Sequence, residues 1–79
     1  MQEFPSYCLC PISSSIMQDP VMCSDGHTYE RKAIEQWLLT HTVSPKTNEE
    51  LTSRKVTSNF ALRDAITHIK ESRKRKGAS

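Results

Sequence analysis

Cysteine and histidine residues near the start of the chain are of types that could bind zinc. Cys8 and Cys10 lie two residues apart, and Cys23 and His27 follow. Structural zinc takes four ligands, which are mostly cysteine thiolates and histidine nitrogens. A zinc site is therefore the first chemistry that these residue types could support.

A domain braced by two zinc ions needs eight ligands in interleaved pairs. Four pairs here have that spacing, and they would give one metal Cys10, Ser13, Glu30 and Ala33, and the other Asp25, His27, Ser44 and Thr47. Alanine has no ligating atom, and neutral hydroxyls are poor zinc ligands. Neither set reaches four ligands, so we expect no metal and no cofactor.

Most of these side chains can form hydrogen bonds in place of metal bonds. We expect a structural polar network of Ser13, Glu30, Asp25, His27, Ser44 and Thr47. The first two would tie the first loop to the start of a helix, and the other four would tie a hairpin to a second loop. Each bond contributes only about 0.5–1.5 kcal/mol net, so an apolar core must supply most of the stability.

The three cysteines do not suggest a disulfide scaffold or a catalytic nucleophile. Their number is odd, and Cys8 and Cys10 are too close together for ordinary disulfide geometry. No cysteine has a local pairing with histidine, and we assign His27 a structural role. We expect Cys10 and Cys23 to be core residues and Cys8 to be exposed.

Composition indicates one small domain. The chain has 79 residues and a net charge of +2, with a basic run at 73–76. It contains no apolar run long enough to span a membrane and no signal-peptide pattern, so we expect an intracellular protein, cytoplasmic or nuclear or both. We assign 1–72 to the domain and 73–79 to a basic, disordered tail.

The pattern of residues predicts an α+β fold. Residues 1–20 and 42–57 are expected to be long ordered loops, and Asp25-Gly26 between short apolar runs predicts a β-hairpin. Apolar spacing predicts a central helix at 31–40 and a second helix that begins after Asn59 and ends near Ser72. The expected core is Leu9, Ile16, Val21, Tyr29, Ile34, Leu38, Leu51, Val56, Leu62 and Ile66.

Six segments in this order resemble the U-box family, the zinc-free relatives of RING ubiquitin ligase domains. They are CPIS at 10–13, MQDPV at 17–21, DGHTYER at 25–31, IEQWL at 34–38, SPKT at 44–47 and SNFAL at 58–62. The similarity runs from about Phe4 to Ile69. It implies a small RING-like fold without zinc, with two loops, a hairpin and two helices.

The resemblance also implies a function as a ubiquitin transferase. U-box domains bind a conjugating enzyme that carries ubiquitin as a thioester and promote transfer to a substrate lysine without a covalent ligase intermediate. They act by positioning the loaded enzyme. The implied partners are that enzyme, ubiquitin and a protein substrate that the residues do not identify.

Site residues carried over by position form a docking surface for the conjugating enzyme. Its implied centre is Ile12, Trp37 and Pro45, with Pro11, Ser14 and Leu38 at the rim. Tryptophan is a favoured interface anchor. Related ligases often hold a cation at position 48 that contacts both ubiquitin and its carrier. Here Asn48 keeps hydrogen-bonding capacity without charge.

Two other functions compete with this one. A U-box-shaped scaffold without ligase activity would bind other proteins or form a homodimer. The neutral Asn48 leaves room for this scaffold, whereas Ile12, Trp37 and Pro45 favour the ligase. A nucleic-acid binder would rest on the basic run alone, because basic and aromatic residues do not alternate on one face. We therefore expect no nucleic-acid partner and no membrane partner.

The rejection of zinc predicts the response of the protein to a chelator. Excess chelator should leave the melting temperature unchanged, since no ligand set binds a metal that supports folding. Thermal unfolding followed by circular dichroism measures this. A drop in melting temperature that added zinc reverses would contradict it.

Overall fold

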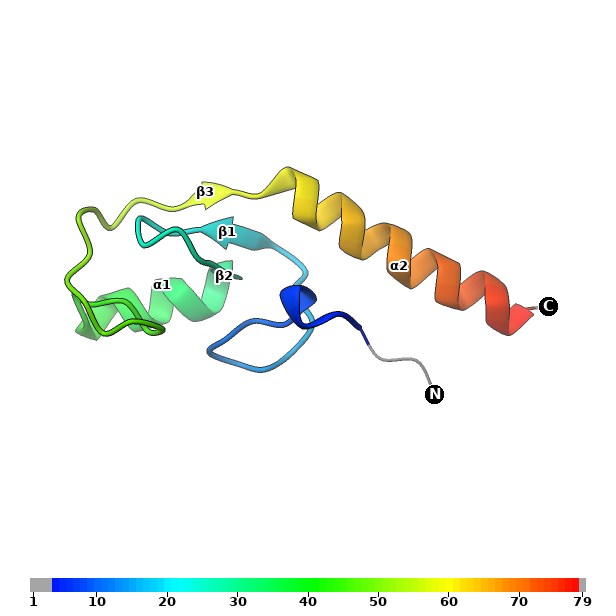
Figure 1. Ribbon diagram of the computed structural model, residues 1–79, viewed down its shortest axis with the longest axis horizontal. Coiled ribbons are helices and arrows are strands. Elements are labelled where there is room, and N and C mark those ends of the chain that lie inside the picture. The colour runs from blue at the N-terminus through cyan, green and yellow to red at the C-terminus, as the bar shows by residue number, and fades with distance from the viewer. Residues whose placement is uncertain (1–3, 79) are drawn as a thin grey trace.

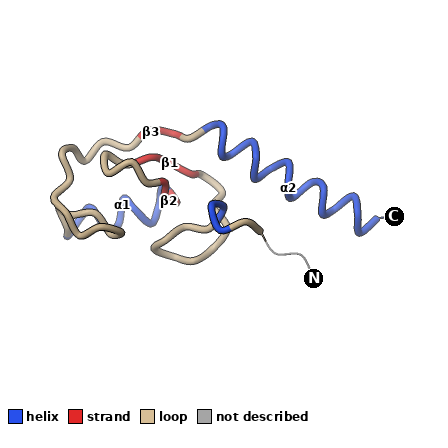
Figure 2. Tube along the Cα trace, viewed as in Figure 1, coloured by secondary structure: helices blue, strands red, loops and turns tan. Residues whose placement is uncertain are grey.

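The protein is described from a computed structural model, which covers residues 4–78 and the side chains of residues 4–72. A short 3-10 helix, η1 (Ser6–Cys8), precedes the hairpin strands β1 (Pro20–Met22) and β2 (Thr28–Glu30). Helix α1 (Arg31–Thr40), strand β3 (Thr57–Ser58) and helix α2 (Phe60–Ala78) follow. Figures 1 and 2 show this α+β architecture, with α2 extending away from the sheet and loops.

The sheet has three antiparallel strands in the order β2-β1-β3. In the central strand, Val21 pairs with Tyr29 on one side and with Ser58 on the other. The hairpin was predicted correctly, and Gly26 takes the positive φ of 84° that its turn requires. Strand β3 was not predicted, because two polar residues give no alternation of apolar and polar positions.

The core forms where the first loop, the hairpin and both helices meet. Its buried apolar residues are Cys8, Cys10, Met17, Val21, Cys23, Tyr29, Ile34, Leu38 and Ile66. Two predictions were wrong. Cys8 was predicted to be exposed but is fully buried, and Leu9 was predicted to lie in the core but is 36% exposed. Leu9 has extended backbone angles, and successive side chains of an extended segment point to opposite sides. Cys8 and Cys10 therefore face inward together.

Helix α1 begins and ends as its apolar spacing predicts. Ile34 and Leu38 lie on its buried face, and the backbone N–H of His41 donates to the Trp37 carbonyl where the helix ends. The Arg54 guanidinium donates to the Leu38 carbonyl. A cation at this end also interacts favourably with the helix dipole.

Helix α2 begins as predicted but ends later. The Asn59 side chain accepts the N–H of Leu62 at 3.1 Å, which satisfies one orphan donor of the first turn. The helix then continues to Ala78, so the predicted end near Ser72 was wrong. Glu, Lys and Arg favour helices, and the first glycine of this segment is Gly77. Ser79 lies outside the described residues.

No helix within residues 4–78 is long and apolar enough to cross a membrane.

Two substitutions on α1 test the division between core and surface. Ile34→Ala should lower the free energy of unfolding by about 2–5 kcal/mol, because the side chain is fully buried. Leu39→Ala should change it by less than about 0.5 kcal/mol, because Leu39 is 78% exposed. Urea unfolding measures both. Equal losses would contradict the placement of the core.

Candidate functional site

The first loop closes on itself in a tight turn around Ile12. The N–H of Ser14 donates to the Cys10 carbonyl at 2.7 Å, and the N–H of Cys10 donates to the Ser15 carbonyl at 2.9 Å. Ser14 takes a positive φ of 62°. Cys10 is buried at the base of the turn, while the Ile12 side chain is half-buried at its tip.

The second loop repeats this turn almost bond for bond. The N–H of Asn48 donates to the Ser44 carbonyl at 2.9 Å, and the N–H of Ser44 donates to the Glu49 carbonyl at 2.8 Å. Asn48 takes the positive φ, 67°, and Ser44 is the buried base. Both turns have proline directly after the buried residue, a repetition that the sequence analysis missed.

The Asp25 carboxylate joins the second loop to the hairpin. Its Oδ2 accepts hydrogen bonds from the Ser44 hydroxyl at 2.6 Å and from the Tyr29 hydroxyl at 2.7 Å. Its Oδ1 accepts the backbone N–H of His27 at 2.8 Å. The Ser44 oxygen in turn accepts the N–H groups of Lys46 and Thr47. One carboxylate therefore fixes the hairpin turn and the base of the second loop.

Three members of this arrangement differ from their expected roles. His27 and Thr47 take part through backbone N–H groups, and the Thr47 hydroxyl accepts the N–H of Glu49 within the loop. Tyr29 was expected only as a core residue, but its hydroxyl is central. Its position four residues after Asp25, across a tight turn, is the signal that could have revealed this.

The titration of Asp25 reflects this bonding. Burial alone would raise the pKa of its carboxyl group, but the bonds from Ser44, Tyr29 and the His27 N–H hold that pKa below its usual value. Burial and the adjacent Asp25 carboxylate raise the pKa of Tyr29, which remains a neutral donor. We call the cluster of Asp25, Tyr29 and Ser44 the Asp25 hub. At neutral pH it consists of the Asp25 carboxylate, the neutral phenol of Tyr29 and the Ser44 hydroxyl group.

Glu30 braces the first loop from the other end of the hairpin. Its carboxylate accepts the N–H groups of Gln18 at 2.7 Å and Asp19 at 3.0 Å. The N–H of Glu30 donates to the Cys10 sulfur at 3.3 Å, which ties the base of the tight turn to the start of α1. Ser13 was expected to bond here, but its hydroxyl oxygen accepts the N–H of Ser15 within its own loop.

Arg31 adds an ion pair to this brace. Its Nε lies 2.7 Å from Asp19 Oδ2, and its Nη2 donates to the Ser58 hydroxyl at 2.7 Å. The sequence analysis did not predict these contacts of Arg31, because only the folded chain brings Asp19 and Ser58 to the same guanidinium. Arg31 therefore links the first loop to β3.

Trp37 lies on α1, beside the entrance to the second loop. Its indole N–H donates to the Val43 carbonyl at 2.7 Å, at the entrance to the second loop. The Trp37 ring is half-buried, as are the side chains of Ile12 and Pro45. Pro11 and Lys46 border one pocket together with His27, so both loop tips approach the hairpin turn.

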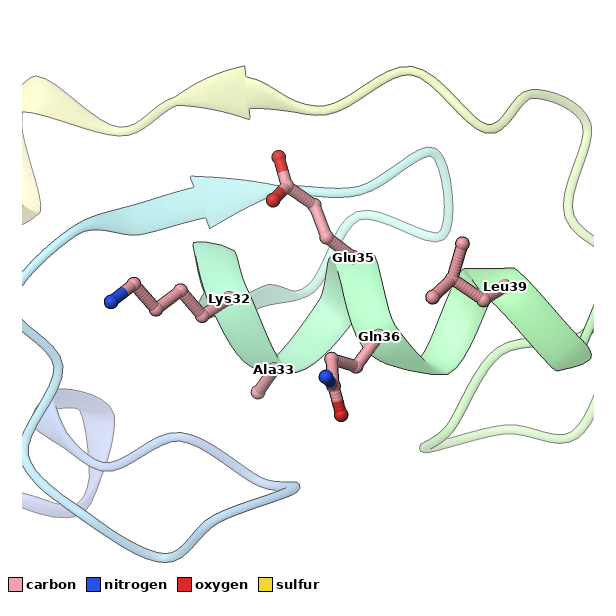
Figure 3. A pocket seen from close by; sticks show the side chains of 5 residues that line it. All are labelled: Lys32, Ala33, Glu35, Gln36 and Leu39. Carbon is pink, nitrogen blue, oxygen red and sulfur yellow. The ribbon is translucent and has the colours of Figure 1, made fainter.

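The outer side of α1 carries a pocket next to Trp37. Lys32, Ala33, Glu35, Gln36 and Leu39 line it, and none of them was predicted as a site residue. In Figure 3, Ala33 and Gln36 point to the side of α1 on which the tips of both loops lie. The pocket contains none of the three expected anchors, and its nearest link to them is Ala33, which lies one helical turn before Trp37 on α1.

The expected rim residues are only partly at the surface. Pro11 and Ser14 are exposed, but Leu38 is only 8% exposed and belongs to the core. Leu38 lies one residue after Trp37, which turns its side chain about 100° around the helix and toward the sheet. Asn48 is exposed and has a positive φ. Asparagine tolerates this left-handed backbone conformation better than most residues, which gives a conformational reason for its presence at position 48.

The cysteines show no metal chemistry in the part of the chain that the structure describes. All three are free and buried, and no group of three or more His, Cys, Asp and Glu residues could hold a metal ion there. Burial raises the pKa of the Cys8 thiol, which disfavours the reactive thiolate.

Comparison with known proteins identifies this arrangement of loops, hairpin and helices. The model of the U-box domain matches residues 4–75. The chain belongs to the U-box family. Domains of this family are generally ubiquitin ligase domains, so membership supplies the class of activity that the site geometry must explain.

Relatives from plants are similar over most of the chain. The chain is 50% identical over 62 residues to U-box domain-containing protein 34 of Arabidopsis thaliana, and covers 8% of that protein. It is 48% identical over 66 residues to U-box domain-containing protein 37, and covers 16% of it. These matches include 78% and 82% of this chain. The chain therefore corresponds to one domain of much longer proteins.

The Asp25 hub predicts a stability loss with a defined pH dependence. Asp25→Asn should lower the free energy of unfolding by about 1–3 kcal/mol at neutral pH, because an amide cannot accept all three hydrogen bonds. Folding lowers the pKa of Asp25, so its contribution to stability is fully present above the ordinary aspartate pKa of 3.8 and is lost as pH falls through the lower pKa of the folded state.

Urea unfolding at pH 7 and in steps below pH 4 measures both effects. The wild-type protein should lose stability in the acid range more steeply than Asp25→Asn does. Asp64→Asn is the matched control, because Asp64 is exposed on α2. Equal effects of the two substitutions at pH 7 would contradict the role of the hub.

Proposed function

We propose that the chain is a ubiquitin ligase module that binds a ubiquitin-loaded conjugating enzyme inside the cell. The observation that carries this proposal is the pair of matching turns, which leave Ile12 and Pro45 half-buried on two fixed loops, while Trp37 is half-buried on α1. Three partly exposed apolar residues on braced backbone suit an incoming loop of another protein. The membership in the U-box family supports the identity of that protein.

Preorganisation is the physical basis of docking. Ordering a loop on binding consumes part of the interaction energy, and a loop that is already fixed avoids this loss. Hydrogen bonds at Asp25 and Glu30 fix the two loops before the partner arrives. The apolar anchors then contribute contact area without first being ordered.

Transfer itself needs no nucleophile from this chain. The substrate lysine attacks the thioester carbonyl, a C–N bond forms, and the C–S bond to the conjugating enzyme breaks. The described cysteines are buried, which is consistent with transfer directly from the carrier enzyme. The ligase accelerates this step by holding the loaded enzyme in a reactive arrangement.

Asn48 determines how strongly the module would activate the thioester. It is exposed on the second loop and can donate or accept hydrogen bonds, but it carries no charge. This feature favours the second candidate, a U-box scaffold that binds proteins or a second copy of itself without ligase activity. An activity assay separates the two.

Reconstituted ubiquitination tests the proposal. The chain is mixed with activating enzyme, a panel of conjugating enzymes, ubiquitin and ATP, and ubiquitin chains or self-modification are measured. Ile12→Ala and Pro45→Ala should each lower the rate at least about tenfold, since loss of an interface anchor weakens binding by about 2 kcal/mol or more. Both variants should retain the circular dichroism spectrum of the wild-type protein.

Phe60→Ala is the matched control, because Phe60 is 58% exposed but lies at the start of α2. It should retain full activity. Full activity of Ile12→Ala and Pro45→Ala would overturn the site assignment. Inactivity of the wild-type chain with every enzyme of the panel would overturn the ligase proposal and favour the scaffold.

A further inference from the structure

An imidazole ring covers one face of Trp37. His41, the first residue after α1, stacks on the indole with ring centroids 3.6 Å apart and an angle of 7° between the planes. The His41 side chain is itself exposed, whereas Trp37 is half-buried. The two rings therefore lie face to face in direct contact.

Hydrogen bonds hold the stacked pair in register. The backbone N–H of His41 donates to the Trp37 carbonyl at 3.0 Å, and the imidazole Nδ1 lies 2.9 Å from Thr40 Oγ1. The same nitrogen lies 3.2 Å from the Trp37 carbonyl oxygen. On the indole, the N–H is fixed by the Val43 carbonyl. The hydrogen bond to Val43 therefore fixes the N–H edge of the indole, and the stack with His41 fixes the plane of the indole ring.

We infer that His41 is a positioning residue, which sets the orientation of Trp37 for the docking of the conjugating enzyme. This inference rests on the function proposed above. The imidazole plane keeps the indole in one rotamer and occupies one of its faces. The incoming enzyme then meets a rigid aromatic surface that needs no ordering.

A role limited to ending the helix would have different requirements. The bond from the His41 backbone N–H to Trp37 can form with any residue except proline at this position. The stack requires an aromatic plane, and the bonds of Nδ1 require a polar side chain. Three substitutions separate these contributions: His41→Phe keeps a plane, His41→Asn keeps a polar group, and His41→Ala keeps neither.

Fluorescence measures the stack without any partner. Trp37 is the single tryptophan of the chain, so its emission reports this site alone. His41→Ala and His41→Asn remove the ring that stacks on the indole. Acrylamide should therefore quench the emission of these two variants more strongly than that of the wild-type protein. His41→Phe should resemble the wild-type protein. Unchanged quenching in His41→Ala would overturn the inference.

Binding to the conjugating enzyme that gives the highest wild-type activity measures the consequence. His41→Ala and His41→Asn should raise the dissociation constant about two- to tenfold, as expected for the loss of one aromatic pair. His41→Phe should restore binding to near the wild-type value. His68→Ala is the control, because His68 is exposed on α2, and it should change neither quenching nor affinity.

The outcomes separate this inference from the proposed function. If the wild-type chain binds an enzyme and His41→Asn binds equally well, the positioning role is wrong while the function stands. If the wild-type chain binds no enzyme, the function fails and the docking role of His41 fails with it. The quenching data then show whether the stack itself exists in solution.

Discussion

The Asp25 carboxylate is the acceptor on which the arrangement of the second loop depends. It is partly buried and accepts hydrogen bonds from the Ser44 hydroxyl, the Tyr29 hydroxyl and the N–H of His27. A buried carboxylate is unfavourable unless its oxygens are satisfied, so the three donors and the acceptor stabilise one another. Among the side chains described above, Asp25 alone anchors Ser44, the buried base of the second loop, to the hairpin.

The second brace, at Glu30, acts on the first loop in a similar way. The two acidic residues lie five positions apart in the hairpin and serve different loops, so a single supersecondary unit fixes both loops of the proposed docking surface. Helix α1, which carries Trp37, follows the hairpin directly. Among the described side chains, no buried nitrogen or oxygen lacks a hydrogen-bond partner. Within the described part of the chain, hydrogen bonds therefore satisfy every buried polar side-chain atom.

Much of this organisation follows from local sequence signals. The Asp-Gly turn, the apolar spacing of α1 and the Asn59 cap predicted three elements at the correct positions. The same signals could not predict β3, whose two residues are defined only by pairing with β1. They also placed Cys8 at the surface, because the alternation of inward and outward residues around Leu9 depends on the bend that η1 introduces. Contacts between distant segments, such as Arg31 with Ser58, have no local signature at all.

The separation of the two braces has a consequence for how such a domain can change. A metal ion bound by four residues is lost when one ligand is replaced, and every segment that it holds is released together. Here Glu30 and Asp25 hold different loops by independent sets of hydrogen bonds. A substitution in one brace loosens one loop and leaves the other in place. Natural variation can therefore adjust the stiffness of each loop in small steps, while the residues exposed at the loop tips stay the same.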